Sequence, residues 1–170
     1  MSDEHPRVTI RELREMKGRG QRIVTLTCYD ALFARLLDAA GVDVLLVEDS
    51  VNQVLAAADT TLSATLEQMI YHTKLVARGA ARALVICDMP FMTYQISRED
   101  ALRNCGRVLA ETGCHAVKLE GGHAIADTVR ALVDVGIPVM GHLGLTPQSV
   151  HALGGYRVQG RDAAAFGALA

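Results

Sequence analysis

The stretch ALVICDMP, residues 83–90, decides the fold. Five apolar residues without polar alternation lead into an aspartate and a proline. This pattern is typical of a β-strand that is covered on both faces. Four other short apolar runs have the same character. We therefore predict five buried strands, at residues 23–29, 42–47, 83–87, 116–119 and 138–140.

Segments of helical period separate these runs, and a short helix near residues 10–16 precedes the first. Three segments begin after a residue that can cap a helix: Asp30, Ser97, and Thr65, which forms a T-x-x-Q capping box with Gln68. The fourth places its apolar residues on one face: Ile125, Val129, Leu132 and Val133. Alternating strands and helices predict an α/β fold with a parallel sheet and right-handed crossovers, in one domain spanning residues 1–170.

The composition argues against several classes of protein. Half of the 170 residues are hydrophobic and 21% are charged, which is typical of a globular domain. A net charge of −2 without a basic block argues against nucleic-acid binding. No apolar run has the length of a membrane span, and the N-terminal MSDEHPR is no secretory signal. The cysteines lack zinc spacing, so we expect buried, reduced thiols in a cytoplasmic protein at Cys28, Cys87, Cys105 and Cys114.

Ionisable residues stand where the predicted strands end. Asp49, Asp88 and Glu120 follow the second, third and fourth strands, and Lys118 faces the same side as Glu120. Ligands of parallel α/β folds bind at the carboxyl ends of the strands. Carboxylates from separate strands suit Mg²⁺, and without a cation they would repel one another. We therefore predict a divalent-metal site at this edge of the sheet.

Structural roles compete with these functional ones. A strand-end aspartate can instead cap the next helix, as we expect for Asp30. Lys118 can either bind a substrate carboxylate or neutralise the acidic site. His142, after the fifth strand, can contact substrate or be a structural residue, whereas we expect His72 to be structural. The glycines of GGYRVQGRD, residues 154–162, are interpreted as loop turns.

Several strings resemble the ketopantoate hydroxymethyltransferase family. They run in chain order over nearly the whole sequence, and the longest are the most specific: EDS (48–50), TTL (60–62), YHT (71–73), CDMPFM (87–92), VKLEGG (117–122), GHLGLTPQS (141–149) and GGYRVQGR (154–161). The resemblance implies a (β/α)₈ barrel of the phosphoenolpyruvate mutase and isocitrate lyase type. Only about the first five β-α units are expected here, followed by a helix barely begun at residues 163–170.

The resemblance also implies an activity. Family members transfer a hydroxymethyl group from 5,10-methylenetetrahydrofolate to 3-methyl-2-oxobutanoate, through enolate chemistry that depends on Mg²⁺, to give ketopantoate for pantothenate and coenzyme A synthesis. By position, Asp49, Asp88 and Glu120 match the acidic groups at the metal. Asp49, Ser50, Asp88 and Lys118 match substrate contacts, with His142 as a further residue near the substrate. The family is oligomeric, so a homo-oligomer is expected.

Two departures from the family pattern qualify this expectation. Glu48 replaces a glycine next to Asp49, and the turn after it differs, with Val51-Asn52-Gln53, Ala57-Ala58 and Ser63 standing where the family usually has glycines and a proline. The family's catalytic base is a glutamate on a later strand, which has no counterpart in these residues. We therefore assign no catalytic residue and expect the 170-residue chain to be inactive alone.

Two other hypotheses about the function are also compatible with the sequence. The chain can be a non-catalytic fragment or pseudoenzyme that associates with intact subunits, since an open sheet leaves edges that favour association. It can also be another Mg²⁺-dependent lyase or mutase of the same superfamily that acts on a different 2-oxo acid. The GHLGLTPQS string favours the hydroxymethyltransferase over this last alternative.

Overall fold

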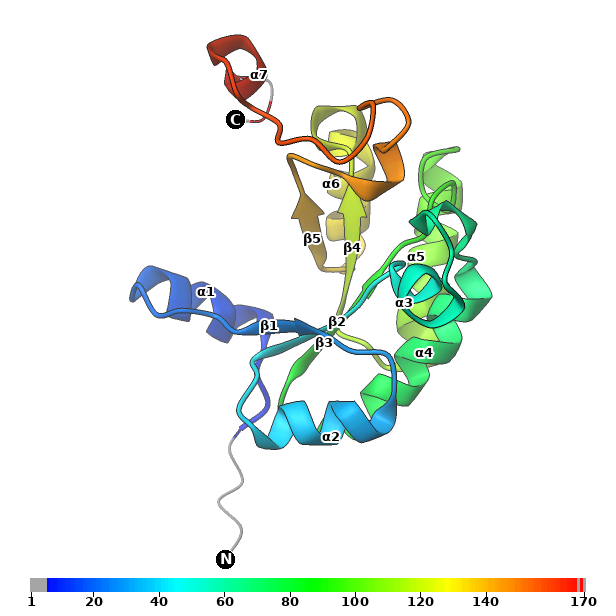
Figure 1. Cartoon of the computed structure of the whole chain (residues 1–170). Helices are drawn as coiled ribbons and strands as arrows, with labels where there is room; N and C mark the ends of the chain where they lie inside the picture. The colour runs from blue at the N-terminus through cyan, green and yellow to red at the C-terminus, as the bar shows by residue number, and fades with distance from the viewer. Residues whose placement is uncertain (1–5, 168, 170) are drawn as a thin grey trace, which may run out of the picture.

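A computed structural model describes residues 6–167 and 169 of the chain. Its centre is a parallel sheet of five strands in the order β1-β2-β3-β4-β5 (Figure 1). Each strand therefore pairs with the next one along the chain, as in the wall of a (β/α) barrel. The strand bounds are β1 (Thr25–Thr27), β2 (Val44–Val47), β3 (Leu84–Asp88), β4 (Ala116–Glu120) and β5 (Val139–His142).

Helices cover the two faces of the sheet unequally. The connecting helices α2 (Ala31–Ala39), α4 (Leu66–Gly79), α5 (Arg98–Thr112) and α6 (Ala126–Asp134) pack on one face, called the outer face here. The helix α1 (Ile10–Gly18) packs on the opposite, inner face (Figure 1). Short elements lie in the loops: α3 (Val51–Ala56), η1 (Thr61–Ser63), η2 (Gly122–Ile125), η3 (Pro147–Ser149) and α7 (Ala163–Gly167).

Strand alternation divides the apolar residues between two clusters. The outer cluster joins strand residues such as Leu45, Val85 and Val117 to the connecting helices. The inner cluster is smaller: Val44, Leu46, Leu84, Ile86 and Ala116 pack with Val8, and Ile10 and Leu13 of α1 lie against them. Because both faces of the central strands are covered, these strands contain continuous apolar runs.

The predicted helix caps are confirmed. The carboxylate of Asp30 accepts hydrogen bonds from the backbone N–H groups of Leu32 and Phe33, so this strand-end aspartate caps α2. Thr65 and Gln68 form the expected capping box at α4. Ser97 accepts from the N–H of Asp100 at the start of α5. Local sequence was sufficient here because a cap needs partners only two or three residues away.

The predictions for the edge strands were partly wrong. β1 is only three residues long and is exposed, whereas the sequence predicted a strand at 23–29 covered on both faces. β5 begins one residue later than predicted, extends to His142 and is half-buried. Both are edge strands that pair on one side only. In α6, Leu132 is buried but Val133 is exposed, so the predicted apolar face is only partly covered.

The prediction of a turn after β2 was also wrong, because residues 51–56 form the helix α3. Ala57 follows the last residue of this helix, and its backbone lies in the left-handed region with φ of 54°. Glycine adopts this conformation without the steric cost that a Cβ brings, so its replacement by alanine here leaves a strained position. The glycines Gly154, Gly155 and Gly160 have positive φ in a loop, as predicted for the GGYRVQGRD segment.

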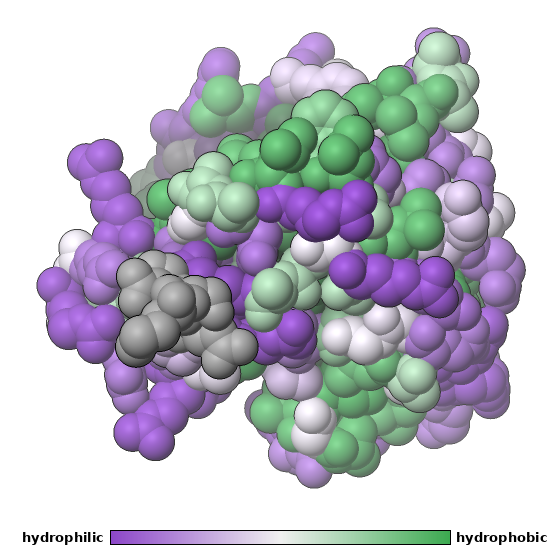
Figure 2. Space-filling model, turned by 90° about the horizontal axis from the view of Figure 1, so that it is seen from below, coloured by the Kyte–Doolittle hydropathy of each residue, from purple (hydrophilic) through white to green (hydrophobic). Residues whose placement is uncertain are grey.

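Two further expectations concern the whole chain. All four cysteines are free and buried, as predicted. No helix within residues 6–167 and 169 is long and apolar enough to span a membrane. Viewed from below, the surface has large hydrophobic areas (Figure 2). The exposed apolar residues include Leu26 on β1 and three residues of α2: Leu32, Phe33 and Leu36.

Candidate active site

A buried ion cluster lies at the carboxyl ends of β3 and β4. The ammonium of Lys118 lies 2.6 Å from Asp88 Oδ2 and 3.5 Å from Glu120 Oε1. Asp88 is the last residue of β3, and Lys118 and Glu120 are two residues apart on β4. Strand alternation therefore places all three side chains on the inner face, as the sequence predicted for Lys118 and Glu120.

Burial and neighbouring charges act in opposite directions on the pKa values of this cluster. Burial raises the pKa of Asp88 to about 7, and the Lys118 ammonium opposes that shift. Burial alone would lower the pKa of Lys118, but the charges of Asp88 and Glu120 raise it overall. Burial would raise the pKa of Glu120, but a hydrogen bond with His142 and the charge of Lys118 lower it overall. Lys118 therefore neutralises the site, which is one of its two expected roles.

Asp49 joins the cluster from the loop after β2. Its side chain is buried, and its Oδ2 accepts a hydrogen bond of 2.9 Å from the Nε2 of Gln148. Burial raises the pKa of Asp49, whereas the hydrogen bond from Gln148 and the charge of Lys118 lower it. The structure thus places carboxylates from three strand ends around Lys118, and their use as metal ligands stays a prediction.

Gln148, in η3, is the residue of this site that sequence reasoning missed. Besides its bond to Asp49, its backbone N–H donates to Glu120 Oε2 at 3.1 Å. The hydroxyl of Tyr94 donates to Gln148 Oε1 at 2.8 Å, and burial raises the pKa of Tyr94, so this donor stays protonated. The signal in the sequence was the GHLGLTPQS string itself, but a glutamine does not ionise, so no pattern of charged residues marks it.

His142 is the last residue of β5, paired in register with Glu120. Its Nδ1 lies 3.2 Å from Glu120 Oε1. His142 therefore belongs to the same cluster, and its side chain is only partly buried. Contact with a substrate stays a prediction. His72 has the structural environment expected for it, because its Nδ1 lies 2.9 Å from the carbonyl oxygen of Tyr29.

The substituted turn after β2 has formed its own hydrogen bonds. Glu48 Oε2 accepts from the hydroxyl of Thr27 at 2.9 Å and from that of Ser50 at 3.2 Å. The Ser50 hydroxyl also lies 2.8 Å from the hydroxyl of Tyr29. Glu48 follows Val44 and Leu46 on the inner face, so strand alternation keeps its carboxylate on the side of the site, where it bonds to Ser50, the residue expected to contact substrate.

Two other departures from the family pattern pair with each other. Asn52 is buried, and its Nδ2 donates to the hydroxyl of Ser63 at 3.1 Å. A glycine and a proline at these positions could not form this side-chain bond. The altered turn is therefore internally consistent, and the two residues stabilise the loop that carries Asp49.

The donor set fits a hard cation with few protein ligands. Asp88 is fully buried, and its Oδ1 has no hydrogen-bond partner, which is rare for a buried carboxylate oxygen. Among the described residues, no group of three or more His, Cys, Asp and Glu side chains could hold a metal ion by itself. Mg²⁺ is usually bound by only one or two carboxylates, with water or substrate completing its coordination. Both oxygens of Glu120 already have protein partners, so Asp49 and Asp88 are the better-placed ligands.

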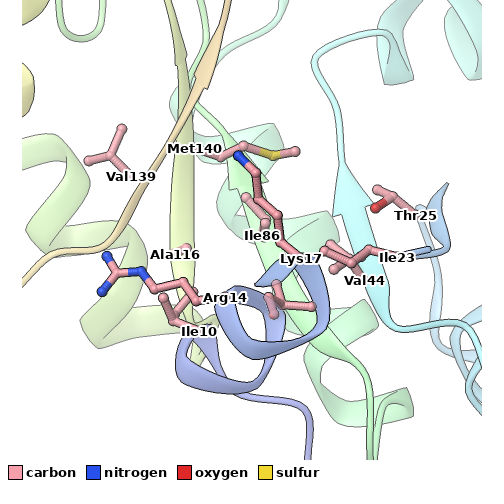
Figure 3. A pocket seen from close by; sticks show the side chains of 11 residues that line it. Ile10, Arg14, Lys17, Ile23, Thr25, Val44, Ile86, Ala116, Val139 and Met140 are labelled. Atoms are coloured by element: carbon pink, nitrogen blue, oxygen red, sulfur yellow. The ribbon is translucent and has the colours of Figure 1, made fainter. Parts of the chain in front are cut away.

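A pocket of about 520 Å³ lies on the same inner face but away from this chemistry. It is lined mainly by apolar side chains of α1 and of the strands (Figure 3). Val44 and Ala116, which line it, are the first residues of β2 and β4. The pocket therefore opens near the amino ends of the strands. Its lining contains no carboxylate, so it cannot supply the predicted metal ligands.

Comparisons with known proteins agree with the sequence motifs. The sequence model of the family described as ketopantoate hydroxymethyltransferase matches residues 7–170. A 3-methyl-2-oxobutanoate hydroxymethyltransferase of Pelobacter propionicus is 53% identical over 161 residues, covering 95% of this chain and 60% of the relative. One from Prosthecochloris aestuarii is 55% identical, covering 92% and 58%. The chain thus spans about three fifths of the length of these curated relatives.

Solved structures show the same fold at low identity. A phosphonopyruvate hydrolase in complex with oxalate and Mg²⁺ superposes with a TM-score of 0.62 at 12% identity, covering 76% of this chain and 50% of that one. A 2,3-dimethylmalate lyase, a member of the PEP mutase/isocitrate lyase superfamily, gives a TM-score of 0.57 at 18% identity, with 77% and 51% covered. The expected fold type is therefore confirmed, and the structure contains the five-stranded part of it. With the family model matching almost the whole sequence, the chain belongs to the ketopantoate hydroxymethyltransferase family.

Proposed function

We propose that this chain carries the metal and 2-oxo acid half of a 3-methyl-2-oxobutanoate hydroxymethyltransferase site. The reaction would transfer a hydroxymethyl group from 5,10-methylenetetrahydrofolate to 3-methyl-2-oxobutanoate and give ketopantoate, for pantothenate synthesis in the cytoplasm. The observation that carries the proposal is the unpartnered, fully buried Oδ1 of Asp88 beside the Lys118 ammonium. The names of the relatives support the choice of reaction.

Mg²⁺ is the proposed metal, with Asp49 and Asp88 as its ligands and Glu120 as a third acidic group nearby. When bound, Mg²⁺ would act as a Lewis acid toward the oxygens of the 2-oxo acid. The oxalate and Mg²⁺ in the phosphonopyruvate hydrolase complex support this choice, since oxalate is itself a dicarboxylate that chelates through neighbouring oxygens.

The chain's own residues have separate roles in this proposal. The charge of Lys118 lowers the pKa values of Asp88 and Glu120, and its ammonium can donate to a substrate carboxylate. The Ser50 hydroxyl, held between Glu48 and Tyr29, can donate to substrate only by giving up its bond to Glu48. Glu48 adds a negative charge beside Ser50, so we expect weaker binding of an anionic substrate than with glycine at this position.

The step that needs a base has no assigned residue in this chain. The resemblance assigns that base to a glutamate on a later strand, so we propose that the 170-residue chain binds the 2-oxo acid but does not turn it over. Assembly as a homo-oligomer is part of the same proposal. If the chain acts as a non-catalytic partner, the proposal also includes its association with intact subunits.

The test separates binding from proton removal. Binding of 3-methyl-2-oxobutanoate is measured by saturation-transfer NMR in D₂O, with and without Mg²⁺, and exchange of the proton next to the keto group is followed in the same tube. We expect Mg²⁺-dependent binding that is lost in Asp88→Ala and Asp88→Asn and kept in Asp127→Ala, which changes an exposed aspartate of α6. Exchange should be no faster than with Mg²⁺ alone.

Other outcomes would change the assignment. Binding that persists in a folded Asp88→Asn variant would place the 2-oxo acid elsewhere and reject the proposal. Exchange that depends on both Mg²⁺ and Asp88 would mean that the chain contains its own base. Equal binding of several 2-oxo acids would favour another lyase or mutase of the superfamily. Circular dichroism on each variant separates loss of the site from loss of the fold.

A further inference from the structure

The side chain of Gln148 has all of its hydrogen-bonding groups occupied. A primary carboxamide has two N–H donors and one oxygen that accepts two bonds. Its Nε2 donates to Asp49 Oδ2 and to the carbonyl oxygen of Met89, both at 2.9 Å. Its Oε1 accepts from the hydroxyl of Tyr94 at 2.8 Å and from Gln95 Nε2 at 3.1 Å. The residue is 6% exposed, so water cannot easily replace these partners.

These partners determine which way the carboxamide points. With oxygen and nitrogen exchanged, the oxygen would face the Asp49 carboxylate and the Met89 carbonyl, and two acceptors would meet without a proton between them. The hydroxyl of Tyr94 has a second acceptor, the carbonyl oxygen of Glu120 at 3.0 Å, so Asp49 and Met89 are the partners that decide the orientation. Only one orientation gives both of these acceptors a donor, so Gln148 is a rigid support for the groups it touches.

Gln148 also joins elements that are far apart in the sequence. Its side chain holds Asp49, 99 residues away, and its backbone N–H holds Oε2 of Glu120, 28 residues away. It does so without adding charge, in contrast to Lys118, whose ammonium neutralises carboxylates but repels a cation. A neutral donor orients a carboxylate and leaves its charge available to a metal ion.

We propose that Gln148 is the positioning residue of this site: it orients the Asp49 and Glu120 carboxylates around the Asp88–Lys118 pair and so determines the affinity for a divalent cation. The proposal rests on the proposed function, because that function supplies the cation. Tyr94 and Gln95 act one step further out by holding the oxygen of the same carboxamide.

The first test is Mn²⁺ binding to the 170-residue chain, measured from the electron paramagnetic resonance of free Mn²⁺. Gln148→Met keeps a side chain of similar length but removes both N–H donors without adding charge, and Gln148→Ala removes the side chain. We expect both to bind Mn²⁺ at least tenfold more weakly. Gln21→Met, which makes the same change at an exposed position, should stay within twofold of the parent. Unchanged affinity in a folded Gln148→Met variant would overturn the proposal.

The second test needs no metal. In ¹H–¹⁵N NMR spectra of the metal-free protein, the side-chain N–H protons of Gln148 should exchange with solvent at least tenfold more slowly than those of exposed Gln21, because both are bonded to buried acceptors. Equal rates would overturn the proposal. If the parent chain binds no Mn²⁺, the metal function fails, and this exchange rate alone decides whether Gln148 holds the carboxylates.

Discussion

The two ends of the inner face of one sheet differ sharply in chemistry. At the amino end, Val44, Ile86 and Ala116 form an apolar surface against α1. Two residues further along β3 and β4, the same face carries Asp88 and Lys118. The backbone is equally regular at both ends, so the difference lies entirely in which side chains alternate onto this face.

The comparison separates two kinds of stability. Packing at the apolar end is non-directional, and each side chain contributes through the area that it buries. At the charged end each group depends on a particular partner, because an unpaired buried charge is costly. We therefore expect mutations at the apolar end to change the free energy of unfolding alone, and mutations at the charged end to change metal binding as well.

The largest effect is expected from Lys118→Met, which leaves Asp88 and Glu120 buried without their common partner. Breaking a buried ion pair in this way costs about 3–5 kcal/mol. Urea unfolding at pH 7.5 measures the loss, and added Mg²⁺ should restore part of it by replacing the missing charge. Lys74→Met, which removes a lysine from a partly exposed pair with Glu111, should cost about 0–1 kcal/mol. Similar losses in both variants would contradict the comparison.

At the apolar end, Ile86→Ala should cost about 2–5 kcal/mol because it removes buried side-chain atoms that pack with the inner cluster and enlarges the pocket between the sheet and α1. Ile86→Val should cost only about 0.5–1.5 kcal/mol. Both losses appear in urea unfolding, and Mn²⁺ affinity measured on the folded protein should stay within twofold of the parent. A tenfold drop in Mn²⁺ affinity would show that the two ends are coupled.

A smaller, stabilising effect is expected at the charged end from Ala57→Gly. The left-handed backbone of Ala57 costs a residue with a Cβ about 1–2 kcal/mol. Glycine removes this strain but loses more entropy on folding, so the net gain should be about 1 kcal/mol. Thermal unfolding measures it as a higher Tm, with Ala58→Gly as the control. A lower Tm in Ala57→Gly would show that the turn is not strained.

The smallest effect should be a pH dependence of the free energy of unfolding that is caused by His115. This residue belongs to neither end of the inner face. Its Nδ1 accepts a hydrogen bond of 3.0 Å from the Val85 N–H, and its Nε2 lies 3.0 Å from the Arg7 guanidinium, whose positive charge disfavours a protonated ring. Burial, together with the charge of Arg7, lowers the pKa of His115 below its usual 6.5. The folded protein then binds fewer protons than the unfolded chain, so this stabilisation is present above pH 6.5 and is lost as the pH falls toward the folded pKa.

Urea unfolding between pH 5 and 8 tests this prediction. Asp88, whose pKa is raised to about 7, gives a pH dependence of the opposite sign in this range, so each variant is compared with the parent at every pH. The stability of the parent relative to His115→Gln should fall as the pH falls, whereas its stability relative to His123→Gln, which changes an exposed histidine, should not depend on pH. Equal slopes in His115→Gln and the parent would rule out His115 as the source.

How far the sequence could predict the site depended on the distance between partners. The capping role of Asp30 followed from neighbours two and three residues away. The meeting of Asp88 and Lys118 followed from the general position of strand ends. Gln148 could not be recognised, because its partners lie up to 99 residues away and its role depends on geometry and not on charge.

The sequence by itself determined the order of strands and helices, the capped starts of three helices and the family, because apolar periodicity and local hydrogen bonds are encoded within short segments. Only the tertiary structure decided that β1 is exposed, that residues 51–56 are helical, that Glu48 bonds to Ser50, and that one glutamine holds two carboxylates. These features depend on which distant groups meet when the strands pair, and burial then sets the energetic cost of every polar group that lacks a partner.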